Sequence, residues 1–366
     1  MSVDVAAYRA SAIRFNNAKI INGLLVSWLV VCVCFSAFNR DLLPRKYFYD
    51  SGHIASLFGR FNGFIIGDSY SNTALFYDLF LLAGNERIAA IITIIIFSIF
   101  SIKCFSAPTR VDLGGLHNVL IFFFSCLVGA IYLAQYSKES LVMLVAFLFF
   151  LLSNSRRQQV LWFVLVCAYA AYFRTYWFLV LLLYFYYRIA FKISRSISFV
   201  LLSIVVAFLA LSIIFHGVLG IDLAYYRYSV NEVREYDVDA QTMIKPLLPI
   251  GNPVLEWANG VIQFFLMFFP FPLLTGNIQY FIFFLVTSSL GVRLFLVIKS
   301  SIAARYLSKP TRENRCLALI VAFVTIQSIF EPDYGSYIKH LTPMLPLVLY
   351  CFCWHQQWQT PREIHA

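Results

Sequence analysis

The residues best suited to chemistry lie in a short polar segment between two apolar runs. Within ten positions this segment carries two carboxylates, an ammonium group and an imidazole: Glu331, Asp333, Lys339 and His340. Pro332 and Gly335 interrupt a helix and favour a tight turn. A carboxylate near a low-dielectric region has a raised proton affinity and suits a general base, and a neighbouring cation suits a phosphate. An ordinary polar connection is the alternative.

Arg174 is a second candidate, because it divides a long apolar region. About 13 apolar residues lie on each side of it, and each run spans roughly 20 Å as a helix. A hairpin of two such short helices would leave Arg174 recessed in the membrane. An unpaired cation there costs roughly several kcal/mol, so a charged residue at such a position is taken as functional by default. The alternatives are a snorkelling interfacial arginine and one tilted span over 160–190. That single span would separate Arg156 from Arg188, so the hairpin is favoured.

A third group of charges follows the first apolar run. It includes Arg45 and Lys46, with Asp50 and His53 close behind them. On the topology derived below these cations lie outside the cytoplasm, against the usual distribution of basic residues. They are therefore candidates for binding an anionic ligand, and lipid headgroups are an equally good alternative.

The composition decides which elements position these groups. Of the 366 residues, 61% are hydrophobic and only 13% are charged, whereas a soluble protein has about 25% charged residues. So few charges exclude a soluble enzyme, a disordered chain and a nucleic-acid-binding domain, although the net charge is +10. The sequence predicts an all-α polytopic membrane protein, with residues 1–366 forming a single membrane domain.

Apolar runs of helical length predict about ten transmembrane helices. A bilayer core about 30 Å thick needs about 20 helical residues. The expected spans are 20–38, 88–105, 117–135, 140–153, 159–173, 175–190, 197–216, 278–298, 316–331 and 341–355. Segment 73–83 is too short to cross. Segment 257–275 is interrupted by Pro270 and Pro272, and we interpret it as re-entrant or interfacial.

Basic residues then predict the sidedness, since cationic short loops stay in the cytoplasm. Both termini are expected there, and the basic cluster at 299–315 remains inside only if 257–275 does not cross. Outside lie segment 39–87, which contains an amphipathic part, and the larger loop 217–256. That loop has six acidic and three basic residues, a sign opposite to that of the inside loops.

This layout resembles the Wzy-type polymerases, which join O-antigen or capsule repeat units in the bacterial inner membrane. The resemblance rests on about ten spans, one larger outside loop, the stretch Phe173–Trp177 and the segment Glu331–Pro346 with Lys339 and His340. It implies two undecaprenyl-diphosphate-linked oligosaccharide substrates, a periplasmic active site and a chain-length regulator as partner. The diphosphate is already an activated leaving group, so no cofactor is expected.

The resemblance also assigns roles to the candidate residues. Asp333 or Glu331 would be the base, Arg174 and Lys339 would stabilise the diphosphate, and His340 would serve either purpose. The catalytic candidates are Asp333, Glu331, His340, Asp50 and His53, the candidates for binding diphosphate or substrate are Arg174, Lys339, Arg45, Lys46, Tyr334 and Tyr337, and no metal ligand is assigned.

Two other functions remain open at this point. An O-antigen ligase, or another glycosyltransferase that uses polyprenyl-linked sugars, shares the sidedness and the chemistry. A transporter or flippase often has two related halves and charges along a path, whereas here the charges lie at the outer ends of spans. A purely structural subunit would leave the polar segment 331–340 unexplained.

Overall fold

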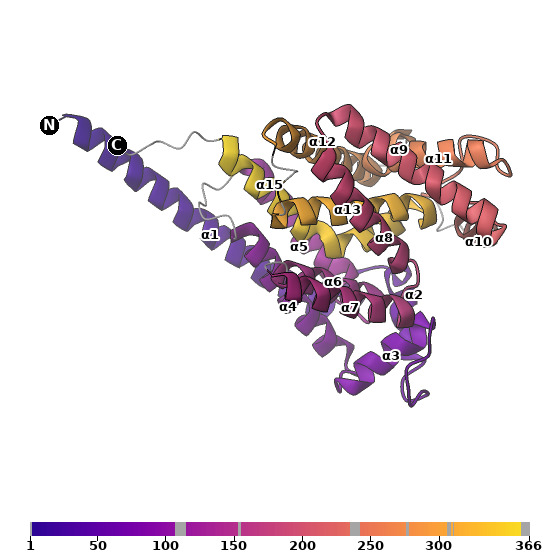
Figure 1. Cartoon of the computed structure of the whole chain (residues 1–366). Coiled ribbons are helices and arrows are strands. Elements are labelled where there is room, and N and C mark those ends of the chain that lie inside the picture. Colours follow the sequence, from indigo (N-terminus) through magenta and orange to yellow (C-terminus); the bar gives the residue numbers. More distant parts are fainter. Residues whose placement is uncertain are drawn as a thin grey trace.

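The computed structural model describes the backbone of residues 2–106, 115–152, 155–234, 242–275, 278–305, 309 and 311–359. Side chains are described from residue 22 to residue 354 within these ranges, except for residues 115, 116 and 275. The described chain is predominantly helical and contains no strand, apart from an isolated bridge between Met243 and Asp333. Figure 1 shows the helices packed side by side, with the long α1 projecting from the bundle.

The first half of the chain carries five of the candidate residues: Arg45, Lys46, Asp50, His53 and Arg174. Its helices are α1 (Ser2–Leu42), η1 (Arg45–Phe48), α2 (Tyr49–Ala55), α3 (Ser69–Leu79), α4 (Glu86–Ser106), α5 (Gly115–Tyr132), α6 (Lys138–Leu151), α7 (Arg156–Tyr172), α8 (Trp177–Ile193) and α9 (Ile197–Ile214), which continues as the π-helical turn η2 (Phe215–Leu219).

The second half completes the bundle. Its helices are α10 (Tyr225–Val233), α11 (Pro253–Phe268), η3 (Phe271–Thr275), α12 (Ile278–Ala303), α13 (Arg312–Phe330), α14 (Tyr334–Leu341), η4 (Thr342–Met344) and α15 (Leu345–Gln359).

Each of the ten expected spans falls on a helix, and five stretches are long and apolar enough to cross a membrane by length and composition. These five are Asn22–Leu42, Glu86–Ser106, Ile197–Leu219, Ile278–Ala303 and Arg312–Phe330. Others are short: α6 has 14 residues and α7 and α8 have 17 each, or roughly 21–26 Å of helix. The chain is thus an all-α protein with membrane-spanning helices, and the total of about ten remains a prediction.

Helix α11 occupies most of the segment that the sequence suggested would not cross. It has 16 residues, which is roughly 24 Å of helix, less than a bilayer core. It ends at Phe268, just before Pro270, because a proline cannot continue the hydrogen-bonded ladder. The indole of Trp257 donates to the carbonyl of Val205, 3.0 Å away, so α11 is fixed against α9.

Helix α13 is the centre of the bundle. Every residue from Asn314 to Ile329 is buried, and α8, α11 and α15 all pack on it. Thr325 of this helix lies 3.0 Å from the hydroxyl of Tyr187 on α8. Glu331 directly follows this enclosed helix and is itself buried.

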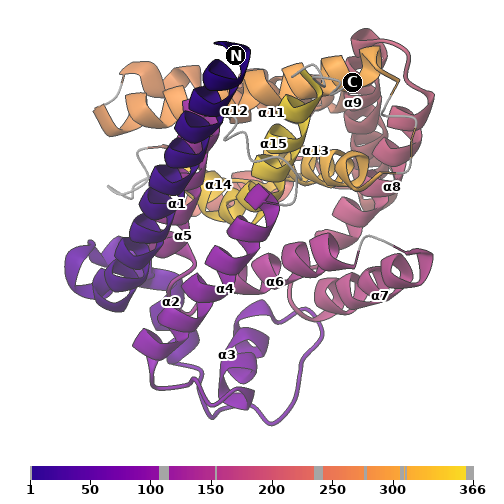
Figure 2. The ribbon, with the colours of Figure 1, turned by 90° about the vertical axis from the view of Figure 1, so that its left-hand side faces the viewer.

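The start of α1 and the end of α15 lie at one end of the bundle, and α2 and α3 lie at the opposite end (Figure 2). At this second end, segment 39–87 is tied to the helix ends around it. Asn39 donates to the carbonyl of Ala134 over 2.6 Å, and Arg40 pairs with Glu86 at 2.9 Å. The amide of Gly67 donates to the carbonyl of Ala171 over 2.9 Å. These contacts place segment 39–87 directly beside the turn that carries Arg174.

Candidate active site

Glu139 is the centre of a buried polar cluster at this end of the bundle. It lies in the first turn of α6, where the cap residue Ser137 accepts from its amide at 3.1 Å and donates to its Oε2 at 2.6 Å. The Glu139 side chain is only 1% exposed. A buried carboxylate needs cationic or hydrogen-bonding partners, and Glu139 has four, contributed by three different segments.

Arg174 is the first of these partners. It lies between α7 and α8, where the amide of Trp177 donates to its carbonyl at 2.9 Å and fixes the turn. Its guanidinium forms an ion pair with Glu139 and donates to the hydroxyl of Tyr176 at 2.8 Å. The Arg174 side chain is 7% exposed. The cation that the sequence singled out is therefore recessed and paired.

His340 bridges Glu139 to Glu331. Helix α13 ends at Phe330, and the short α14 then brings His340 back over Glu331. Nδ1 of the imidazole bonds to Glu331 Oε1, and Nε2 lies 2.9 Å from Glu139 Oε1. Burial lowers the pKa of His340, but the two carboxylates outweigh it and the pKa is raised. An imidazolium is thus favoured between two carboxylates.

Glu331 has one carboxylate oxygen in use and one free. The residue is 2% exposed, and its Oε1 is held by His340. Within the part of the chain that the structure describes, no donor reaches the buried Oε2. A buried acceptor without a donor costs roughly 1–3 kcal/mol, so this oxygen is poised to accept a hydrogen bond or a proton from a ligand.

Lys339 and Asp50 join α14 to α2. Their side chains form an ion pair, and the hydroxyl of Tyr70 donates to Asp50 Oδ1 over 2.6 Å. Burial raises the pKa of Asp50, but the charges of Lys339 and Lys138 outweigh it, so the pKa lies well below its usual range. The same Lys339 ammonium is 4.0 Å from Glu139 Oε2. Asp50 is therefore an ionised carboxylate within the cluster.

Lys138 completes this side of the cluster. Its ammonium lies 3.5 Å from the centre of the Tyr70 ring, a cation–π contact. Burial and the positive charge of Arg174 lower the pKa of Lys138 to about 8. Lys138 directly precedes Glu139 in the sequence, so the start of α6 contributes both of these charges to the cluster.

Arg227, on α10, approaches Glu331 from the other side. It is 4% exposed, and its guanidinium donates to the carbonyl of Ser328. It also lines a small cavity with Asn259 and Gln263 of α11. Its Nε is buried and has no acceptor among the described residues. A buried cation bound only to a carbonyl keeps most of its charge available for an anion.

The remaining candidates on segment 331–340 are Asp333, Tyr334 and Tyr337, and their contacts stabilise the fold. Both oxygens of Asp333 are committed: Oδ1 caps α14 by accepting from the amide of Ser336, and Oδ2 accepts from Arg234, each over 2.7 Å. Tyr334 and Tyr337 are buried, at 3% and 0% exposure. Of the two carboxylates considered as a base, Glu331 belongs to the Glu139 cluster, whereas Asp333 connects α14 to Arg234 in segment 217–256.

Three candidates from segment 39–87 lie at the surface. Arg45 and Lys46 are exposed on η1, and His53 is exposed on α2. The His53 ring stands edge-on to Tyr70, with 4.6 Å between ring centroids. Asp50 is the candidate in this segment that an ion pair with Lys339 ties to the cluster. His53 approaches the cluster only through Tyr70.

The charges of the cluster leave a positive excess. Three carboxylates face four cations and His340; the carboxylates are Asp50, Glu139 and Glu331, and the cations are Lys138, Arg174, Arg227 and Lys339. Among the described residues, no group of three His, Cys, Asp or Glu side chains is arranged to hold a metal ion. The arrangement suits an anionic ligand that also presents a proton to Glu331.

Sequence reasoning missed Glu139, Lys138 and Arg227 as members of the site. Glu139 and Lys138 were not among the candidates, although two charges directly before the apolar run of α6 were an available signal. Arg227 gave no such signal, since it is one of three basic residues in an acidic loop. Its importance follows from its burial beside Glu331.

The fold and the cluster define a class: an all-α membrane protein with a buried, positively biased polar site at one end of its helices. Comparison with protein-family models, with curated proteins and with solved structures finds no match to this chain. Any more specific function therefore has to be argued from the site itself.

Proposed function

We propose that this chain is a membrane-embedded glycosyltransferase that polymerises undecaprenyl-diphosphate-linked oligosaccharide repeat units. In this proposal the site faces the periplasm of a bacterial inner membrane. The resemblance to Wzy-type polymerases motivates the substrate class, and the buried cluster supplies the residues. The observation that carries the proposal is the Glu331–His340 pair, in which one buried carboxylate oxygen is bound by imidazole and the other is free.

The reaction requires one proton transfer and one departing anion. A hydroxyl of one repeat unit attacks the anomeric carbon of the growing glycan, which is bonded to its lipid diphosphate. The new glycosidic C–O bond forms as the bond to the diphosphate breaks, and the hydroxyl proton moves to Glu331 Oε2. The lipid diphosphate leaves with the electron pair, and the proton is later released to water or to the diphosphate.

His340 and Glu139 keep Glu331 ready for this transfer. Glu331 Oε1 already accepts from the imidazole, so Oε2 is the oxygen that remains for the substrate. Glu139 holds the opposite nitrogen of His340 at 2.9 Å and fixes the ring orientation. When Glu331 takes up a proton, the imidazolium of His340 remains paired with Glu139, which is also held by Arg174.

The cations around the cluster suit the departing diphosphate. Arg174 is paired with Glu139, and Lys339 lies between Asp50 and Glu139. Arg227 has no described carboxylate within ion-pair distance. Fixed cations in a region of low dielectric stabilise a developing anion more strongly than they do in water. Glu331 is 2% exposed, so the side chains that cover it must shift before a substrate reaches it.

The decisive assay uses purified protein with defined lipid-linked repeat units, and its products are separated by chain length. Glu331→Gln and His340→Gln should each reduce the polymerisation rate by roughly 10²–10⁴-fold, the usual contribution of a general base. Asp333→Asn is the matched control, because asparagine also caps a helix. It should reduce the rate less than about tenfold, since Arg234, its ion-pair partner, is one-third exposed.

The same assay separates the rival functions. Transfer of a single glycan to a lipopolysaccharide-core acceptor, with no polymer, would identify a ligase. Movement of the lipid-linked substrate between leaflets without a new glycosidic bond would identify a flippase. Full activity of Glu331→Gln beside an inactive Asp333→Asn would refute the assignment of the base.

A further inference from the structure

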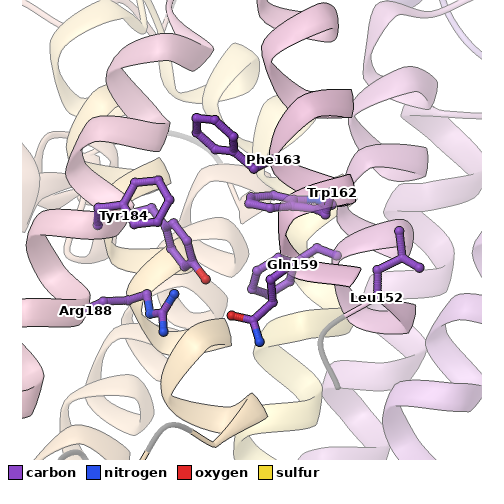
Figure 3. A pocket seen from close by; sticks show the side chains of 8 residues that line it. Leu152, Gln159, Trp162, Phe163, Tyr184 and Arg188 are labelled. Carbon is purple, nitrogen blue, oxygen red and sulfur yellow. The ribbon is translucent and has the colours of Figure 1, made fainter. Parts of the chain in front are cut away.

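A second candidate site lies at the other end of the bundle, between α7 and α8. It is a crevice lined mainly by aromatic rings, with Trp162 and Phe163 on α7 and Tyr184 and Phe185 on α8. Two polar side chains close one end of it. Figure 3 shows the amide of Gln159 and the guanidinium of Arg188 pointing toward one another below the rings.

The surface around this crevice is apolar and exposed. Phe163 and Phe185 are 37% and 40% exposed, and Leu182 and Ile189 beside them are 54% and 64% exposed. In a membrane protein, such a face of adjacent helices contacts acyl chains rather than water. Arg188 lies five residues before the end of α8 at Ile193, so its cationic head is about 8 Å of helix away from that end.

The charges nearby are predominantly positive. The guanidinium of Arg188 lies 5.5 Å from the centre of the Tyr184 ring, and among the described residues no carboxylate lies within ion-pair distance of it. Arg315 of α13 is close enough to Arg188 to interact with it electrostatically. Glu313, the acidic residue in the first turn of α13, accepts a hydrogen bond from the hydroxyl of Tyr350.

We infer that this crevice binds one anionic phospholipid, with its phosphate on Arg188 and Gln159 and its acyl chains along the exposed faces of α7 and α8. Guanidinium groups bind phosphate oxygens well, and basic pockets between transmembrane helices are known to bind anionic lipid headgroups. Charge complementarity selects an anionic over a zwitterionic lipid. The apolar belt selects a lipid over a soluble phosphate. This inference is independent of the proposed glycosyltransferase.

Trp162 provides a built-in reporter. Its ring lines the crevice and is held in place by a 3.1 Å hydrogen bond to the carbonyl of Val145. The full chain is reconstituted into bilayers that contain increasing fractions of brominated phosphatidylglycerol or brominated phosphatidylcholine. Bromine quenches nearby tryptophan fluorescence, and subtracting the signal of Trp162→Phe isolates the contribution of this residue.

The expected result is half-maximal quenching of Trp162 at a phosphatidylglycerol fraction about fivefold lower than for phosphatidylcholine, the ratio that corresponds to about 1 kcal/mol for one basic side chain near anionic lipid. Arg188→Met should bring this ratio close to one. The matched control is Arg195→Met, which removes an exposed charge after α8 and should keep the ratio. Equal quenching by both lipids in the wild-type chain would overturn the inference, whether or not the variants fold.

Discussion

The ion pair between Glu139 and Arg174 allows a sharp test of the buried cluster. Replacing Glu139 with glutamine keeps the size of the side chain but removes its charge. Arg174, 7% exposed, would then have no carboxylate within the described cluster close enough for an ion pair. Breaking a buried ion pair by removing one partner costs about 3–5 kcal/mol, and we predict a loss of this size in the free energy of unfolding.

A second ion pair at the same end of the bundle provides the control. Arg40 and Glu86 are 2.9 Å apart, but their side chains are 53% and 16% exposed. Exposed pairs contribute about 0–1 kcal/mol, so Glu86→Gln should destabilise the protein far less than Glu139→Gln. Both variants remove one negative charge from the same region, and they differ mainly in burial.

Unfolding in mixed micelles with a rising fraction of sodium dodecyl sulfate measures both losses. Trp177 is fully buried and three residues from Arg174, so its fluorescence reports on the region around the pair. The double variant Glu139→Gln/Arg174→Gln should be about 2–3 kcal/mol more stable than the sum of the two single losses predicts, because no unpaired buried charge remains in this pair. Strict additivity, or equal losses for the Glu139 and Glu86 variants, would refute the structural assignment.

Three further predictions concern pH, packing and sidedness. The folded protein raises the pKa of His340, so protonated His340 stabilises the fold fully below pH about 6.5, and this stabilisation is lost as the pH rises through the folded-state pKa. The free energy of unfolding should therefore fall between pH 6 and 9, and His340→Gln should make this fall smaller. An unchanged slope in the variant would contradict the assignment. Gly129→Ala would place a methyl group 2.6 Å from the Phe97 ring and should cost about 1–3 kcal/mol, whereas Gly23→Ala, which has no side-chain neighbour within 4 Å, should not lower the midpoint of a thermal melt. Sidedness can be tested with an impermeant maleimide in a background without the natural cysteines. In intact cells the reagent should label Thr175→Cys, which is exposed beside Arg174, whereas it should label Lys192→Cys only after permeabilisation. The reverse pattern would invert the proposed topology.

The cluster also explains why so many charges are tolerated inside an apolar chain. Each described carboxylate of the cluster contacts at least one cationic group, and the connections run between segments far apart in sequence: Lys339 and Asp50 are separated by 289 residues. Such pairing avoids isolated buried charges, which are the costly ones. It also ties α2, α6, α14 and the turn before α8 into one unit, so substitutions in the site are expected to affect stability as well as activity.

The sequence alone determined the class of protein and the places where charge enters the membrane domain. Apolar length and low charge content are properties of each segment by itself, which is why the expected spans fall on helices. Arg174 and the segment 331–340 could be singled out in the same way, since each interrupts an apolar run. The number of helices that cross the membrane does not follow from apolar length in the same way, because several apolar helices are shorter than the thickness of a bilayer core.

Only the tertiary structure decided how these charges are used. It placed Glu139 at the centre, between Arg174 and His340, whereas the local sequence shows only two charges before an apolar run. It also separated two carboxylates that are two positions apart, because Asp333 turns to Arg234 and the amide of Ser336 while Glu331 turns to His340. Ion pairs depend on proximity in space, and the partners of these residues come from helices that the order of the sequence does not bring together.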